Sequence, residues 1–346
     1  MEKTRTDKGS AMTSRELAFE ALKHKTPERI LFTLYLEKPL FEKLSNLLGP
    51  RDTWPCPQDD IIRILWEIED HDVTAGGFKD RFDCEWRQGE GACTFVNPPL
   101  TKPDISKIPR IDLVPQSDIE QILKTRREHP DKFIFYQFTA CFGERLWNLR
   151  GLEQILMDYL LEPDFVHAAL DILMEMHMVA LEKILPLPID GVTFGDDFGT
   201  QRGLMVSRNV FCKFFKPRLA KMYEKVRLAG KVTGHHSCGD NTEIMGDFVD
   251  IGLQVFHPLQ PEAMNIRNIK KEFGRDLTFR GGIGTQGAIV FGSPDQARAE
   301  VREAVKILSE NGGYFMETTK PLPPETPVEN ALAVIEEMSR VMNYQF

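Results

Sequence analysis

Two imidazoles and a thiol lie close together in the segment Gly-His-His-Ser-Cys-Gly-Asp at residues 234–240. If the preceding residues 231–235 form a β-strand, side chains alternate between its faces, so His236 and Cys238 point the same way. A neutral imidazole and a thiolate are common ligands of zinc. The pair therefore indicates a candidate metal site. A His-x-Cys pair also arises readily by chance in a chain with 6 Cys and 8 His, so the surrounding elements must decide.

The composition is that of an ordinary globular protein, with 346 residues, 42% hydrophobic and 27% charged. A net charge of −9, with both signs interspersed, argues against nucleic acid or an anionic membrane as the main partner. No apolar run reaches the roughly 18 residues of a membrane span, and the charged N-terminus lacks a signal core. The cysteines show no disulfide-framework spacing, so we expect reduced thiols and a cytoplasmic location.

Predicted strands and helices alternate along the chain. A capping box at residues 13–16 opens a helix that should end near residue 25, behind a disordered extension at residues 1–12. Short apolar or β-branched runs predict strands at residues 30–35, 71–77, 133–138, 191–195, 231–235, 253–256, 277–280 and 313–316. Helices are predicted near residues 39–48, 58–68, 116–128, 152–160, 163–184, 207–229, 241–251, 265–273, 294–311 and 326–343. Residues 80–115, rich in Gly, Pro and aromatics, predict a hairpin or lid-like excursion.

Eight successive strand–helix units match the count of a closed barrel. We therefore predict an α/β fold, a single (β/α)8 TIM barrel over residues 13–346 with an N-terminal helical extension. An open doubly wound sheet is the alternative. No Gly-x-Gly-x-x-Gly follows the first predicted strand, which disfavours a dinucleotide-binding fold.

Polar residues follow most of the predicted strands, where barrels carry their catalytic groups. These candidates are Glu37, Asp196, Asp197, His235, His236, Cys238, His257, Gln260, Arg280, Gly281, Gly282, Gly284, Glu317 and Lys320. Simpler explanations exist for each: an aspartate can cap a turn, a histidine can be a satisfied loop residue, and Glu317 with Lys320 can be a surface pair. The glycines can serve tight turns, or their backbone N–H groups can capture an anion of a cofactor.

Several of these segments carry a family likeness that spans roughly residues 14–343. The chain resembles the uroporphyrinogen decarboxylase superfamily, in particular its corrinoid (cobalamin)-dependent methyltransferases. The segments that carry the likeness are residues 146–153, 196–201, 234–240, 258–262, 281–286 and 324–330. The resemblance implies a (β/α)8 barrel. The arginine-rich segment that grips propionates in true decarboxylases is replaced near the first strand by Thr-Leu-Tyr-Leu-Glu-Lys at residues 33–38, which favours the methyltransferase branch.

The methyltransferase branch implies a zinc held by a His-x-Cys pair and a further cysteine after the eighth strand. The pair matches His236 and Cys238, but the further cysteine position falls at Lys320, whose ammonium group is no metal ligand. Glu317 is the substitute we expect as third ligand, and Asp197 or Glu37 could also complete the site. Lys320 would then face an anionic substrate group.

The implied activity is transfer of a methyl group between a small methylated substrate or thiol and a corrinoid bound to a separate carrier protein. Asp196, Asp197 and His257 are the expected catalytic residues; Glu37, His235, Gln260 and Lys320 are the expected substrate contacts. One alternative is a metal-free lyase acting on a small carboxylated substrate, with Asp196 or Asp197 as acid or base. Another is a non-catalytic barrel that binds a corrinoid or tetrapyrrole.

Overall fold

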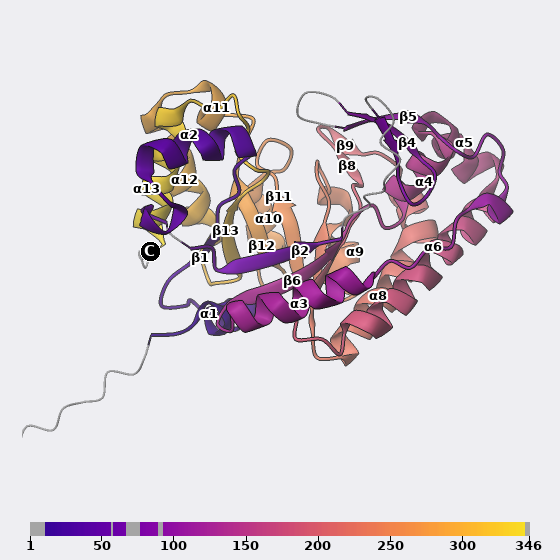
Figure 1. Cartoon of the computed structure of the whole chain (residues 1–346), viewed down its shortest axis with the longest axis horizontal. Helices are drawn as coiled ribbons and strands as arrows, with labels where there is room; N and C mark the ends of the chain where they lie inside the picture. The colour runs from indigo at the N-terminus through magenta and orange to yellow at the C-terminus, as the bar shows by residue number, and fades with distance from the viewer. Residues whose placement is uncertain (1–10, 57, 67–76, 89–92, 343–346) are drawn as a thin grey trace, which may run out of the picture.

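The computed structural model describes residues 11–56, 58–66, 77–88 and 93–342 (Figure 1). Its main sheet has eight strands, each paired in parallel with its neighbours. In spatial order they are β1 (Leu31–Thr33), β13 (Tyr314–Thr318), β12 (Thr278–Ile283), β11 (Val255–Leu259), β10 (Val232–His236), β7 (Gly191–Gly195), β6 (Phe133–Phe138) and β2 (Ile61–Leu65). The Asp60 N–H, just before β2, donates to the Phe32 carbonyl in β1 at 3.0 Å, so the sheet nearly closes on itself. The predicted barrel is confirmed.

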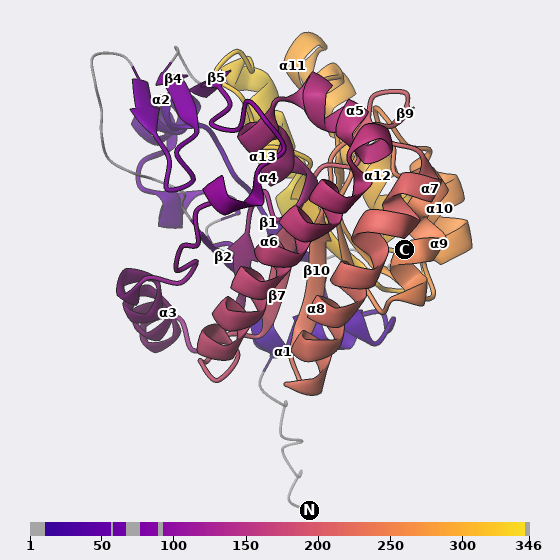
Figure 2. The same ribbon diagram turned by 90° about the vertical axis from the view of Figure 1, so that its right-hand side faces the viewer.

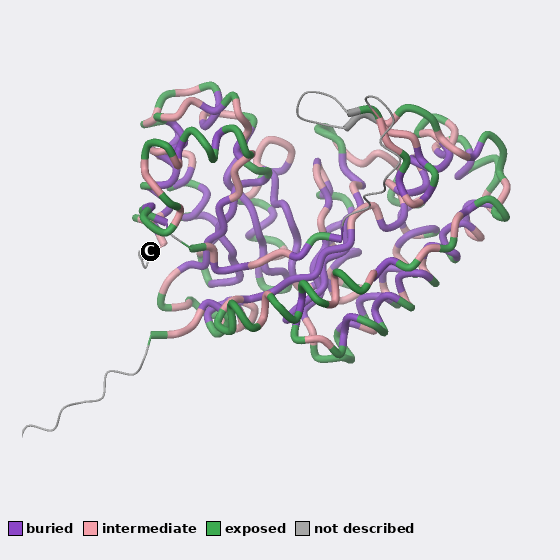
Figure 3. The backbone as a smooth tube through the Cα atoms, in the orientation of Figure 1, coloured by how far each residue is buried: buried purple, intermediate pink, exposed green. Residues whose placement is uncertain are grey.

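Helices surround this sheet (Figures 1 and 2). They are α2 (Lys38–Leu48), α3 (Gln116–Glu128), α6 (Pro163–Ile184), α7 (Arg208–Val210), α8 (Lys216–Leu228), α9 (Met245–Asp250), α10 (Ile266–Phe273), α11 (Ala288–Phe291), α12 (Pro294–Leu308) and α13 (Val328–Val341). Short 3-10 turns occur at Arg51–Thr53, Ile105–Lys107 and Thr242–Ile244. Figure 3 shows the central strands mostly buried, while the outer helices alternate between buried and exposed residues. Among the described residues, no helix has the length and apolar character needed to cross a membrane.

The N-terminal helix α1 (Ser14–Leu22) lies across one end of the barrel. The predicted capping box is present, because the Thr13 side chain and the Glu16 side chain each accept the other's backbone N–H. Leu17, Ala18 and Ala21 pack against inward-facing apolar side chains, namely Leu31, Ile61, Phe133, Phe135, Val232, Val255 and Phe315. This cluster closes the end of the barrel at which the strands begin.

Strand alternation then places polar side chains above that apolar cluster. On five strands the residue two positions after a residue of that cluster is polar; these residues are Thr33, Arg63, Gln137, His257 and Glu317. His236 on β10 also comes after a residue of the cluster and faces the interior. The register pairs Thr33 with Glu317 and His236 with His257, so these residues share one level. The barrel interior therefore changes from apolar to polar toward the carboxyl ends of the strands.

A second group of elements rises beside this polar end (Figure 1). It contains the antiparallel sheet of β3 (Gly77–Lys79), β4 (Glu85–Gln88) and β5 (Cys93–Asn97), the helices α4 (Gly143–Arg150) and α5 (Leu152–Leu161), and the hairpin of β8 (Gly199–Thr200) and β9 (Gly203–Leu204). The buried pair Arg145–Asp80 joins α4 to the antiparallel sheet at 3.1 Å. The predicted excursion at residues 80–115 thus includes a small sheet.

Some sequence predictions were wrong, and others concern residues that the structure does not describe. The helix expected at residues 58–68 is strand β2, and α4 was not predicted. The strand expected at residues 71–77 falls almost wholly outside the described residues. The helix expected at residues 207–229 is interrupted by a π-turn at Phe211–Phe215. Residues 1–10 of the expected disordered extension also lie outside the described part of the chain.

Candidate active site

Three potential metal ligands meet at the carboxyl ends of β7 and β10. Asp197, His236 and Cys238 each offer a ligand atom, and these atoms all lie within 4.8 Å of one another. His236 Nε2 is 3.4 Å from Cys238 Sγ and 3.8 Å from Asp197 Oδ1. Asp197 is held in place because its Oδ1 accepts the Cys238 backbone N–H at 2.7 Å. We call these three residues the ligand group.

The ligand group has the spacing that zinc requires. Bond lengths of about 2.0–2.3 Å and a tetrahedral angle separate two ligand atoms by about 3.5 Å. The two separations from His236, 3.4 and 3.8 Å, lie close to that value, and the Cys238 and Asp197 ligand atoms lie within 4.8 Å of each other. The residues present therefore fit a divalent metal with one imidazole, one thiolate and one carboxylate ligand.

Hydrogen bonding also sets the tautomer of His236. Burial lowers the pKa of both His236 and His257, the latter to about 4, so both rings are neutral at pH 7. His257 Nε2 lies 3.5 Å from Glu317 Oε1, a long contact with a group that can only accept, which places the His257 proton on Nε2. His257 Nδ1 then accepts from His236 Nδ1 at 2.8 Å. His236 Nε2 is left with a lone pair facing Cys238 and Asp197, the form a metal ligand needs.

Glu317 does not join the ligand group. Its carboxylate accepts two hydrogen bonds from Arg280, and Arg63 Nη2 lies 3.8 Å from its Oε1. Burial works against ionisation, but Arg280 first, then Arg63 and His257, hold the Glu317 pKa far below its usual value. The structure thus brings Asp197, rather than Glu317, to the His-Cys pair.

Asp196 and Asp197 occupy different environments. Asp196 is fully buried and accepts the backbone N–H groups of Phe142, Gly143 and Glu144 at 2.8–3.0 Å, so it holds the start of α4. Burial, followed by the charges of Asp197 and Asp196, raises the pKa of the nearby Glu144 to about 8. We call Asp196, Asp197 and Glu144 the acidic cluster. Of these three residues, Asp197 belongs to the ligand group.

Lys320 lies exposed beside the ligand group and interacts with the Cys238 thiol. Desolvation by the surrounding protein works to lower the Lys320 pKa, but Cys238 and then Asp197 and Glu144 outweigh this effect and raise the pKa. Burial and then Asp197 raise the pKa of Cys238 to about 11, although Lys320 opposes that shift. The thiol is therefore protonated at pH 7 unless a cation replaces its proton.

Two of the residues expected as substrate contacts, His235 and Gln260, bond to other parts of the protein. His235 points out of the barrel, where its Nδ1 meets the Tyr223 hydroxyl at 2.7 Å and its ring packs between Phe198 and Phe248. Gln260 is buried and its Oε1 accepts the Gly239 N–H at 2.9 Å, which fixes the loop that carries Cys238. His235 therefore lies outside the site, and Gln260 supports it from behind.

The loop that follows β12 contacts two of the protein's own carboxylates. Glu262 Oε1 accepts the backbone N–H groups of Thr285 and Gln286 at 2.8 and 2.9 Å. A Cβ at Gly284 would lie 2.6 Å from oxygens of both Glu262 and Glu300, so a larger residue would displace these carboxylates. Gly281 and Gly282 have φ of 110° and 84°, which favours glycine. The anion that binds the backbone N–H groups of this loop is therefore the protein's own Glu262 carboxylate.

Glu37 lies half-buried at the start of α2, where its backbone N–H donates to the Leu322 carbonyl. Its side chain forms no hydrogen bond or ion pair with the described residues. It lies on the loop after β1, which pairs with the loop after β13 through Leu36 and Leu322. Glu37 is thus near the loop of Lys320 but is not brought into the ligand group.

Sequence reasoning missed Arg63 and Glu144. Arg63 was not predicted because the apolar spacing at residues 58–68 indicates a helix, although a single arginine inside the apolar run of β2 is a usable signal. Glu144 follows the end of β6 within a segment for which no element was predicted. Its Oε2 accepts the Asp197 N–H at 3.2 Å.

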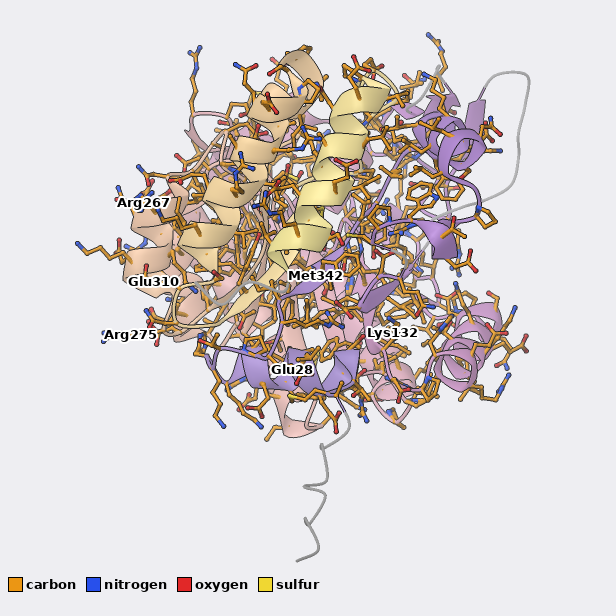
Figure 4. All side chains as sticks on the ribbon, turned by 90° about the vertical axis from the view of Figure 1, so that its left-hand side faces the viewer. Glu28, Lys132, Arg267, Arg275, Glu310 and Met342 are labelled. Atoms are coloured by element: carbon orange, nitrogen blue, oxygen red, sulfur yellow. The ribbon has the colours of Figure 1, made fainter. Side chains whose placement is uncertain are left out.

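Two cavities lie away from the ligand group. One of about 390 Å³ is lined by Thr26, Ile30, Lys306 and Tyr314, among others, and one of about 380 Å³ by Arg267, Lys270, Arg275 and Glu310, among others. Arg267, Arg275 and Glu310 lie on the same side of the molecule in Figure 4. A smaller apolar groove lined by Trp147, Ile155, Tyr159 and Phe215 reaches Asp197. Only this groove adjoins the candidate site among these three.

The fold and site together define a (β/α)8 barrel with a potential metal-ligand group at the carboxyl ends of its strands. Residues 82–341 match the model of the uroporphyrinogen decarboxylase (URO-D) family. The match covers most of the chain, so the protein belongs to the uroporphyrinogen decarboxylase family. No curated protein sequence matches the chain.

Solved structures are similar over most of the chain. A methyltransferase from Methanosarcina mazei superposes with a TM-score of 0.69 at 17% identity, covering 95% of this chain and 99% of that one. At this identity the likeness shows the fold alone. GH26A from Muricauda sp. gives a TM-score of 0.45 at 9% identity, covering 95% and 94% of the two chains. A 3-keto-L-gulonate-6-phosphate decarboxylase from Vibrio cholerae gives 0.35 at 10% identity, covering 90% and 99%.

Proposed function

We propose that this protein is a methyltransferase that moves a methyl group between a small methylated substrate or thiol and a corrinoid carried by a partner protein, assisted by zinc. The observation that carries the proposal is the ligand group, in which Asp197, His236 and Cys238 have the spacing of zinc ligands. Membership of the URO-D family and the fold shared with a methyltransferase support it.

Zinc, when bound, would act as a Lewis acid on the heteroatom that gives up or accepts the methyl group. The chain's own residues prepare that position. Glu317 and His257 orient His236 so that Nε2 carries the lone pair. The Cys238 amide fixes Asp197, and Gln260 fixes the loop behind Cys238. These contacts hold the three ligand atoms together before an ion arrives, which reduces the reorganisation that binding requires.

The partner protein must reach the same end of the barrel. The carboxyl ends of the strands lie at the end of the barrel opposite α1. The reacting atoms of barrel enzymes are found at that end. A corrinoid would therefore be presented above the ligand group, with its carrier in contact with the surrounding loops.

Metal analysis tests the proposal directly. Protein purified without chelator should contain close to one equivalent of zinc, and Cys238→Ser and Asp197→Asn should each lose most of it. Cys212→Ser is the matched control, because Cys212 is also partly exposed but its thiol faces Asp247 at 3.6 Å on the outside of the barrel. Its zinc content should equal that of the wild type. A wild-type protein that neither contains nor takes up zinc would contradict the proposal.

A methyl-transfer assay tests the activity. Free methylcobalamin should be demethylated in the presence of a thiol by the zinc-loaded wild type and not by Cys238→Ser. The change in the corrinoid absorption spectrum gives the rate. Zinc binding without any methyl transfer to a panel of thiols would instead favour a barrel that binds the metal but serves another reaction.

A second candidate is a metal-free lyase acting on a small carboxylated substrate. The acidic cluster favours it, because a Glu144 pKa of about 8 keeps that carboxyl protonated at pH 7 and able to donate a proton. In such a lyase, the positive charge of Lys320 beside Cys238 would replace the positive charge of a metal ion. Activity that survives complete removal of metal and is abolished in Glu144→Gln would select this candidate.

A further inference from the structure

One of the two cavities away from the ligand group lies at the end of the barrel where the strands begin. It has a volume of about 380 Å³ and lies between α10 and α12. The loops that lead from these helices into β12 and β13 border it, so it lies at the barrel end opposite the ligand group. We call it the basic cavity.

The charged side chains that line the basic cavity are mostly positive. Arg267, Lys270, Lys271 and Arg275 are cationic, and Glu310 provides the one carboxylate among the lining residues. Counted from Arg267, the other three cations follow at three, four and eight residues, so one side of α10 and its continuation carries all four. Figure 4 shows Arg267, Glu310 and Arg275 along one side of the molecule. The cavity therefore holds an excess of positive charge.

Within the described part of the chain, a single member of these four cations has a carboxylate partner. Arg267 Nη2 lies 2.5 Å from a Glu303 oxygen on α12. Lys271 and Arg275 are exposed, and neither forms an ion pair with a described residue. The positive charge of the basic cavity is thus not neutralised by the protein's own acids.

Lys270 is the most deeply buried of the four cations. It is 8% exposed, and its Nζ donates to the Gly312 carbonyl at 2.6 Å, with no described carboxylate at ion-pair distance. Burial lowers the Lys270 pKa to about 8, and the charge of Glu310 opposes that shift. Buried lysines are normally paired with an acid. An anion inside the cavity would supply the missing partner.

The size of the basic cavity and its surroundings favour a small ligand over an extended one. A volume of about 380 Å³ lies within the range of small-molecule sites. The chain carries a net charge of −9, and the exposed acids Glu272 and Asp276 lie next to the cationic residues in sequence. These negative charges weaken attraction to a nucleic acid or an anionic membrane. Guanidinium and ammonium groups both bind phosphate oxygens well.

We propose that the basic cavity is a binding site for a small phosphorylated compound with at least two anionic groups, such as a diphosphate. Lys270 binds one anionic group in the buried part of the cavity, and Lys271 and Arg275 bind the other where the cavity is exposed. Glu310 repels the ligand and limits its affinity. Because the cavity and the ligand group lie at opposite ends of the barrel, the phosphorylated compound does not compete with the substrate of the proposed function.

Calorimetry with pyrophosphate tests the basic cavity. The wild type should bind one pyrophosphate, and more tightly than inorganic phosphate, which carries fewer charges. Lys271→Gln and Arg275→Gln should each weaken binding about three- to fivefold, as expected for exposed charges. Glu310→Gln should instead tighten it by a similar factor, because the repelling carboxylate is removed. Arg298→Gln is the matched control, since Arg298 lies on α12 in a surface pair with Glu336 and its loss should leave binding unchanged.

Two comparisons separate binding from other effects. Lys271, Arg275 and Glu310 are exposed, so their variants should unfold at the same urea concentration as the wild type while the affinity for pyrophosphate changes in opposite directions. Pyrophosphate also binds divalent metal ions. Cys238→Ser, which removes a member of the ligand group, should therefore bind pyrophosphate with the wild-type affinity.

Several results would overturn the inference. They are the absence of saturable pyrophosphate binding by folded wild type, an unchanged affinity in the double variant of Lys271→Gln and Arg275→Gln, and loss of binding in Cys238→Ser, which would assign it to a metal. Binding to phosphatidylserine vesicles that pyrophosphate does not displace would assign the cations to a membrane surface instead. Pyrophosphate binding that persists in Cys238→Ser supports the basic cavity whether or not the protein transfers methyl groups.

Discussion

Replacing Glu317 by Gln should destabilise the protein strongly, because it leaves two buried guanidinium groups without a counter-charge. Glu317 and its partner Arg280 are 2% and 1% exposed, and Arg63 lies 3.8 Å away. Removing one member of a buried ion pair typically costs about 3–5 kcal/mol, since the remaining charge stays desolvated. We expect a loss of that size for Glu317→Gln at pH 7.

The thermal shift that corresponds to this loss follows from the size of the chain. An unfolding entropy of about 2.1 cal/mol/K per residue gives about 0.7 kcal/mol/K for a chain of this length, so the midpoint should fall by about 4–7 °C. Glu336→Gln is the matched control, because Glu336 is 56% exposed and pairs with Arg298 on the surface at 2.8 Å. Its effect should stay below about 1 kcal/mol. Urea titration and thermal melts followed by circular dichroism measure both variants.

The difference between wild type and Glu317→Gln should depend on pH. The ion pair with Arg280 holds the folded-state pKa of Glu317 well below its unfolded value of about 4.3. The stability that Glu317 contributes is therefore fully present above about pH 5 and is lost as the pH falls toward the folded-state pKa. We expect the gap between the two proteins to narrow below about pH 5. A loss under about 1 kcal/mol at pH 7, or a gap that stays constant from pH 7 to pH 3.5, would refute the reasoning.

Three further outcomes are expected. Asp196→Asn should cost about 1–2 kcal/mol in urea unfolding by weakening the carboxylate that caps α4, with zinc content unchanged. Tyr223→Phe should cost about 1–3 kcal/mol, because His235 Nδ1 loses its buried partner, and should also leave zinc content unchanged. Zinc affinity, measured by competition with a chelator of known affinity, should tighten about tenfold per pH unit between pH 6 and pH 8. The reason is that Cys238, with a pKa of about 11, must lose its proton to bind; a flat profile would contradict that role.

The order of strands and helices could be predicted from the sequence because most strands are short apolar runs bounded by helices with an amphipathic pattern. The failure at β2 has a physical cause. Ile61 and Ile64 are buried, Ile62 is partly buried and Leu65 is 42% exposed, so apolar residues occupy both faces of β2 and do not alternate with polar ones. Their spacing of one, three and four also fits one face of a helix. The error hid Arg63, whose side chain faces the barrel interior, and with it the charge balance around Glu317.

The candidate site was predictable in part. Alternation along β10 correctly places His236 and Cys238 on one side, with Nε2 and Sγ 3.4 Å apart. It also assigns His235 to the opposite side, among Tyr223, Phe198 and Phe248, so the same rule could have removed His235 from the list of substrate contacts. The choice between Asp197 and Glu317 could not be made this way. It depends on Arg280 engaging Glu317 and on the Cys238 amide holding Asp197, and neither contact is encoded in local spacing.

The charges around the ligand group explain how a lysine can stand where the resemblance predicts a cysteine. A divalent ion with an ionised Cys238 and Asp197 would be neutral, as it would be with two thiolates, so Asp197 supplies the negative charge that Lys320 does not. Lys320 then adds a positive charge beside the group, and Arg63 adds another across the barrel.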